Sequence, residues 1–126
     1  MVNNNDTKIR IIGAGPTGAM LAIALSRVGS LVDIIDKKTI PDISSRSRAY
    51  AITNSTRIFL ERIKLWDKLI PYLVPFQSLY LEDREINKHV IFQANDYCDR
   101  NSLRKEIGWI IDHQHLIVMI LIYQVF

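Results

Sequence analysis

The sequence has a single cysteine among its 126 residues and no long hydrophobic run. One cysteine, Cys98, excludes an internal disulfide and is typical of a reducing compartment. The longest apolar run, at 116–123, is too short to span a bilayer as a helix. The N-terminal "MVNNNDTK" lacks the apolar core of a signal peptide. We therefore expect one soluble cytoplasmic domain, preceded by a disordered lead-in at residues 1–7.

An excess of charge of one sign is also lacking. The net charge is only +3, and acidic and basic residues are interleaved, which argues against a nucleic-acid partner despite the local "SSRSR" at 44–48. The motifs H-E-x-x-H, C-x-x-C and G-x-S-x-G are absent. His89, His113 and His115 have no acidic or cysteine partners at ligand spacing, so we expect surface or capping roles for them and no metal.

What is present is a glycine-rich stretch, "RIIGAGPTGAMLAIALSRVG", at residues 10–29. The short β-branched run before it predicts a strand over 8–12, and helical spacing of apolar residues predicts a helix over 17–28 with Gly29 as its stop. A second strand is predicted over 31–35. The helix's expected apolar stripe is Met20, Leu21, Ala24, Leu25 and Val28. This order predicts a βαβ unit with parallel strands.

The three glycines form G-x-G-x-x-G between the first strand and the helix. Gly13 allows a tight turn, Gly15 has no Cβ to keep a pyrophosphate from the backbone, and Gly18 lets the helix approach the strand. Pro16 and Thr17 complete this loop at the helix N-terminus, where unpaired N–H groups attract phosphate. The loop predicts dinucleotide binding; the alternative is a turn that only connects a strand to a helix.

Asp36 follows the second strand, at the position where a carboxylate accepts hydrogen bonds from the adenosine ribose. A negative charge there argues against a 2′-phosphate. Lys37, directly after it, is a further candidate for cofactor contact. These features do not separate FAD from NAD.

The rest of the chain predicts mixed α/β structure. Residues 41–47 are expected to form a loop, and Asn54 or Ser55 to cap a helix that runs to about Leu65. That helix is expected to direct Ile58, Phe59, Ile63 and Trp66 to the core, and Trp66 and Trp109 are interpreted as packing residues. A hairpin is predicted over 78–94, and a strand or loop followed by a helix over 103–122.

Three stretches resemble flavin-dependent aromatic hydroxylases. They are the glycine loop with the following "VDIIDK", "SRAYAITNSTRIFLERIKLWDKL" at 47–69, and "IGWIIDHQHL" at 107–116. The second and third are most similar to the ubiquinone-biosynthesis branch, the 2-octaprenyl-phenol hydroxylases, which are relatives of p-hydroxybenzoate hydroxylase. The resemblance extends over residues 8–116.

The resemblance implies a Rossmann-like FAD-binding domain. It implies that the enzyme uses FAD, NAD(P)H and O₂ to hydroxylate a small aromatic quinone precursor, with a peripheral membrane contact to collect a prenylated substrate. It also implies that the loop glycines hold the pyrophosphate and that Asp36 holds the ribose. Arg48 would bond a phosphate or the flavin end, and Gln114 would offer a polar side chain to the cofactor.

The sequence also departs from that family. Its members are much longer and carry a later Gly-Asp segment and a substrate domain, so residues 8–126 are expected to be the N-terminal part of the FAD-binding domain. The apolar tail from Leu116 is expected to find little protein to bury it. We expect the isolated chain to bind FAD poorly and to lack hydroxylase activity. The alternatives are a non-catalytic remnant or nucleotide-binding module and, least supported, an NAD-dependent dehydrogenase half-domain.

Overall fold

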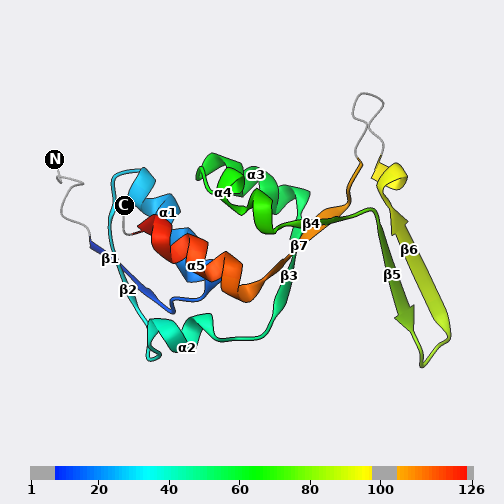
Figure 1. The fold of residues 1–126 in the computed structure, drawn as a ribbon, viewed down its shortest axis with the longest axis horizontal. Helices are drawn as coiled ribbons and strands as arrows, with labels where there is room; N and C mark the ends of the chain where they lie inside the picture. Colours follow the sequence, from blue (N-terminus) through cyan, green and yellow to red (C-terminus); the bar gives the residue numbers. More distant parts are fainter. Residues whose placement is uncertain (1–7, 98–104, 125–126) are drawn as a thin grey trace.

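The computed structural model describes residues 8–97 and 105–124 (Figure 1). The predicted lead-in at 1–7 and Cys98 lie outside these residues. The chain begins with β1 (Lys8–Ile12), α1 (Pro16–Arg27) and β2 (Leu31–Ile35). The two strands are parallel and pair in register from Lys8 with Leu31 to Ile12 with Ile35. The predicted α/β class and the βαβ unit are therefore confirmed.

Helix α1 buries small residues, and the predicted apolar stripe is partly wrong. Its buried residues are Ala19, Ala22 and Ile23, whereas Leu21 is 47% and Val28 is 77% exposed. Helix α1 packs on β2 on one side and on a later helix on the other. Close packing on both sides favours the alanine face, because alanine lets two backbones approach. The helix ends as predicted, with Gly29 at φ +85°.

A short helix, α2 (Ile40–Ser44), occupies the segment expected to be a loop. Thr39 and Asp42 form a capping box at its start, and Pro41 lies in the first turn, where its missing N–H has no helical partner. The loop prediction is therefore wrong for residues 41–44, where the capping box and a proline tolerated at a helix start form a helix, and right for residues 45–47.

The second sheet has the order β3-β7-β4 and is antiparallel. Its strands are β3 (Ala49–Thr53), β7 (Gly108–Asp112) and β4 (Val74–Phe76). Strand β7 confirms the predicted strand before the last helix, while β3 was not predicted. This strand is held by pairing with residues far along the chain, such as Ala49 with Asp112, and the sequence next to it does not reveal that partner.

Helix α3 (Asn54–Arg62) is capped by Thr53, whose Oγ1 accepts from Thr56 N at 3.3 Å, and not by Asn54 or Ser55. The helix stops before the predicted Leu65, and the chain turns at Lys64 with φ +59° into α4 (Trp66–Leu69) and η2 (Ile70–Tyr72).

The face of α3 that enters the core differs from the prediction. Ile63 and Trp66 are buried as expected, but Ile58 is 46% and Phe59 is 37% exposed, and Leu60 is fully buried instead. Trp66 packs edge-to-face on Trp109 with ring centroids 5.0 Å apart, which confirms both as packing residues.

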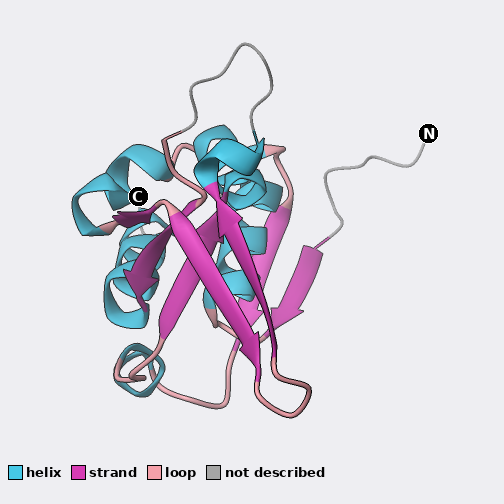
Figure 2. Cartoon of the chain, turned by 90° about the vertical axis from the view of Figure 1, so that its right-hand side faces the viewer, coloured by secondary structure: helices cyan, strands magenta, loops and turns pink. Residues whose placement is uncertain are grey.

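The predicted hairpin is confirmed as β5 (Ser78–Asp83) and β6 (Lys88–Gln93), with Asn87 at φ +50° in its turn. It extends away from the helices in Figure 1 and faces the viewer in Figure 2. Every residue of β5 is exposed. The short η3 (Ala94–Tyr97) follows the hairpin.

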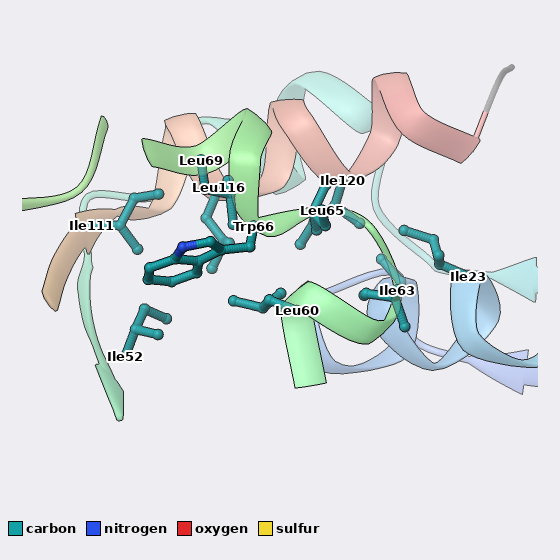
Figure 3. Close-up of a cluster of buried hydrophobic side chains, with 11 residues drawn as sticks. Ile23, Ile52, Leu60, Ile63, Leu65, Trp66, Leu69, Ile111, Leu116 and Ile120 are labelled. Carbon is teal, nitrogen blue, oxygen red and sulfur yellow. The ribbon is translucent and has the colours of Figure 1, made fainter. Parts of the chain in front are cut away.

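Helix α5 (His113–Gln124) lies beside α1 and supplies the centre of the core (Figure 3). Leu116, Ile117 and Ile120 are buried, so the expectation that this apolar tail finds little protein to cover it is wrong for one face. Val118 and Ile122 on the other face remain exposed. The core cluster comprises Ala19, Ile23, Ile52, Leu60, Ile63, Leu65, Trp66, Leu69, Ile111, Leu116 and Ile120.

We expect Leu60→Ala to lower the free energy of unfolding by about 2–5 kcal/mol, because it leaves a cavity in this core. The matched change Ile58→Ala, two residues away on the exposed face of α3, should stay within about 0.5 kcal/mol of wild type. Urea unfolding measures both. Similar losses for the two variants would contradict the assignment of the core face.

Candidate functional site

The glycine loop joins β1 to α1 with very close packing. Gly13 has φ +109°, and its N–H donates to Ile35 O at 2.7 Å. A Cβ on Gly18 would lie 2.0 Å from Gly13 O, so only glycine lets the first turn of α1 rest on the loop. A Cβ on Gly15 would meet nothing within 4 Å, so the loop is open at that point. The structure thus supports the turn predicted at Gly13 and the close helix approach predicted at Gly18, while the role of Gly15 towards a pyrophosphate stays a prediction.

The N-terminus of α1 is electrostatically prepared for an anion. Gly15 is the N-cap, no side chain caps the helix, and the first turn contains no acidic residue. Pro16 occupies the first turn and Thr17 is exposed beside it. No side chain of the first turn therefore competes with an external anion for the helix dipole and the first-turn N–H groups, which fits a phosphate.

Asp36 lies against this loop. Its Oδ2 accepts from Ala14 N and its Oδ1 from Lys38 N, both at 2.8 Å. These hydrogen bonds, that of Ala14 first, lower the pKa of the carboxyl group, and the nearby Arg46 adds to the effect. The carboxylate is therefore ionised at neutral pH, and each oxygen retains a lone pair that can accept from a hydroxyl group. Lys37 is exposed.

Arg48 and Gln114, far apart in the sequence, line the same hollow. Its volume is about 470 Å³. The lining residues come from two segments and are Arg46, Ser47, Arg48, Ala49, Asp112, His113 and Gln114. The first segment carries the two arginines, and the second runs from the end of β7 into the start of α5. The structure therefore brings together the two side chains that the resemblance assigns to the cofactor.

Arg46 was not among the predicted site residues. It is half-buried, lines the hollow with Arg48 and adds to the lowering of the pKa of Asp36. The alternation in "SRSR" is the only sequence signal for it, and that pattern is also typical of a solvated loop.

The expectation of a surface or capping role is wrong for His113 and right for His115. The His113 side chain is fully buried, with Nε2 2.6 Å from Ile43 O and Nδ1 3.0 Å from Tyr50 Oη. His115 lies in the first turn of α5, where Asp112 Oδ1 accepts from His115 N at 2.8 Å and Oδ2 contacts Nδ1. These bonds lower the pKa of Asp112. Within residues 8–97 and 105–124, no three His, Cys, Asp or Glu side chains are grouped as metal ligands.

A parallel βαβ unit with this loop and carboxylate defines the class of dinucleotide-binding domains. Within that class, residues 6–91 match the family described as "FAD binding domain", and the chain belongs to this family. FAD is thus the dinucleotide of the site, as the resemblance implied.

Comparison with individual proteins agrees with this assignment. The chain is 22% identical over 106 residues to 3-(3-hydroxy-phenyl)propionate/3-hydroxycinnamic acid hydroxylase of Escherichia coli, covering 84% of this chain and 17% of the relative. It is similar in fold to Klebsiella pneumoniae HpxO complexed with FAD and uric acid, with a TM-score of 0.65, 17% identity, and coverage of 94% of this chain and 28% of that one. For p-nitrophenol 4-monooxygenase PnpA of Pseudomonas putida, the TM-score is 0.66 and the identity 16%, with 94% and 29% covered. The chain therefore spans less than a third of any of these proteins.

In the described part of the chain, no helix combines the length and apolarity needed to cross a membrane.

We expect Gly18→Ala to destabilise the fold by at least about 1–3 kcal/mol, because its Cβ would overlap Gly13 O. Gly15→Ala is the matched control: its Cβ enters open space at an ordinary φ of −68°, so stability should remain within about 0.5 kcal/mol of wild type. Thermal unfolding of the two variants measures the difference. Equal stability would contradict the close packing of α1 on the loop.

The lowered pKa of Asp36 predicts a specific pH dependence of stability. Because folding lowers this pKa, the carboxylate stabilises the fold above about pH 4, and the contribution is lost as the pH falls through the lower folded-state value. We expect Asp36→Asn to unfold at a lower temperature than wild type at pH 7, and the difference between the two unfolding temperatures should shrink below pH 4. A difference in unfolding temperature that does not depend on pH would contradict this account.

Proposed function

We propose that the chain forms the FAD-binding part of an FAD-dependent monooxygenase that hydroxylates a small aromatic compound with NAD(P)H and O₂. The observation that carries the proposal is the arrangement of an open, uncapped glycine loop with an ionised Asp36 bonded to it through Ala14. The family match and the hydroxylase relatives support the reaction class.

The glycine loop and Asp36 would hold the adenosine diphosphate half of FAD. The first-turn N–H groups of α1, including those of Thr17 and Gly18, would donate to the pyrophosphate, and Gly15 would let it approach. Pro16 would keep the first turn in helical geometry. Asp36, already oriented by two backbone donors, would accept from the ribose hydroxyls.

The hollow beside the loop would contact a second part of the cofactor. Arg48 would supply a charge-assisted hydrogen bond and Gln114 a polar contact, because both line this hollow. Arg46 is added to this set because it contributes to lowering the pKa of Asp36 and lines the same hollow. The exposed Lys37 would contact the adenosine side of the cofactor.

When bound, FAD supplies the redox chemistry by which NAD(P)H and O₂ support hydroxylation. The described residues of this chain would bind and orient it, and we assign none of them as a catalytic acid, base or nucleophile. As a narrower proposal, the substrate is a phenolic quinone precursor, collected by a cytoplasmic protein at the membrane surface. The resemblance of residues 47–69 and 107–116 to the ubiquinone-biosynthesis hydroxylases supports it.

The second candidate is a nucleotide-binding module without hydroxylase activity. The family match supports this candidate, because the matched family is described only as an FAD-binding domain. An assay of the purified chain for NAD(P)H oxidation coupled to phenol hydroxylation tests whether the chain is inactive on its own. We expect no hydroxylation by the isolated chain, and coupled turnover would contradict that expectation.

FAD binding is tested by titration of flavin fluorescence with two aspartate variants, one on β2 and one directly after it. The wild-type chain is expected to bind FAD weakly. Asp36→Asn should lower that affinity about tenfold further, because it removes a charged acceptor at the ribose. Asp33→Asn is the control: Asp33 lies on β2, three residues before Asp36, and its carboxylate pairs with Lys8 at 2.7 Å. It should bind FAD like wild type. Equal weakening in both variants, or no binding by wild type, would contradict the proposed site.

A further inference from the structure

One buried imidazole contacts both ends of the segment that carries the two arginines. This segment, residues 44–49, is called the arginine segment below. Ile43 directly precedes it and Tyr50 directly follows it. His113 Nε2 lies 2.6 Å from Ile43 O, and His113 Nδ1 lies 3.0 Å from Tyr50 Oη. His113 N also donates to Arg48 O at 2.7 Å, within the segment itself.

The chemistry of these contacts fixes the direction of each bond. The Ile43 carbonyl can only accept, so the ring carries its proton on Nε2, and in the neutral ring Nδ1 accepts from the Tyr50 hydroxyl. The side chain is fully buried, so water cannot replace either partner without opening the structure. The imidazole is therefore satisfied only when both ends of the arginine segment are in place.

We propose that His113 is a positioning residue for the cofactor site. It holds the arginine segment against the start of α5, so that Arg48 from the segment and Gln114 from the helix line one hollow. This inference rests on the proposed function, in which Arg48 and Gln114 contact FAD. The two bonds join His113 to residues that are 70 and 63 positions away in the sequence. The hollow therefore depends on a contact between its two segments, which neither segment can form alone.

The first test is amide hydrogen exchange on the full chain without FAD. His113→Leu removes both bonds and should speed exchange in the arginine segment by about tenfold. His113→Gln should recover much of the protection, because its amide can donate to Ile43 O. Tyr50→Phe, which removes one bond and keeps the half-buried aromatic ring, should give a smaller increase in the same segment and carries the test if His113→Leu does not fold.

The control is Ile120→Val, a mild change at a fully buried residue of the same helix. It should leave exchange in the arginine segment unchanged relative to the rest of the chain. An unchanged rate in both His113→Leu and Tyr50→Phe would overturn the proposal. A rise spread evenly over the chain, equal to that in the control, would also overturn it, since that is the signature of general destabilisation.

The second test is FAD affinity by flavin fluorescence. His113→Leu should weaken binding about tenfold, with recovery in His113→Gln and wild-type affinity in Ile120→Val. Faster local exchange with unchanged affinity would overturn the positioning role. Failure of wild type to bind FAD would instead contradict the proposed function, and the exchange data would still decide whether His113 holds the segment.

Discussion

The close contact between the first turn of α1 and the glycine loop is the constraint on which the cofactor site depends. Gly18 allows it, since any side chain there would overlap Gly13 O. The contact places an uncapped helix N-terminus at the open side of the loop, and the hydrogen bond from Ala14 N fixes Asp36 beside it. The proposed contacts to the pyrophosphate and to the ribose therefore depend on the same packing, and loss of that packing would disturb both.

The second sheet and α5 support this unit from one side. Helix α5 packs on α1 and α2, and its buried residues join those of α3 and α4 in one core. The start of α5 also forms the hollow with the arginine segment, so the core that stabilises the fold positions the second part of the site. The hairpin β5–β6 and the outer residues of β1 and β2 do not share this core, and Ile12 is 88% exposed.

Local features were predictable from the sequence, and long-range ones were not. The βαβ unit, its loop and Asp36 lie within 29 residues, from Lys8 to Asp36, and their signals are turn residues and short-range periodicity. Strand β3 was missed because it pairs with β7 near the other end of the chain. Leu60 replaced Ile58 in the core because α4 and β3, which pack on α3, determine which of its faces is covered. His113 was misjudged because its partners, Ile43 and Tyr50, are distant in sequence.

The most direct test of the central claim is a backbone amide NMR titration of the chain with FAD. The account predicts that the largest shift changes occur at residues 13–18 and at Asp36, followed by those of the hollow at 46–49 and 112–114. Shift changes concentrated on the hairpin or on the exposed face of α5, with the glycine loop unaffected, would contradict it.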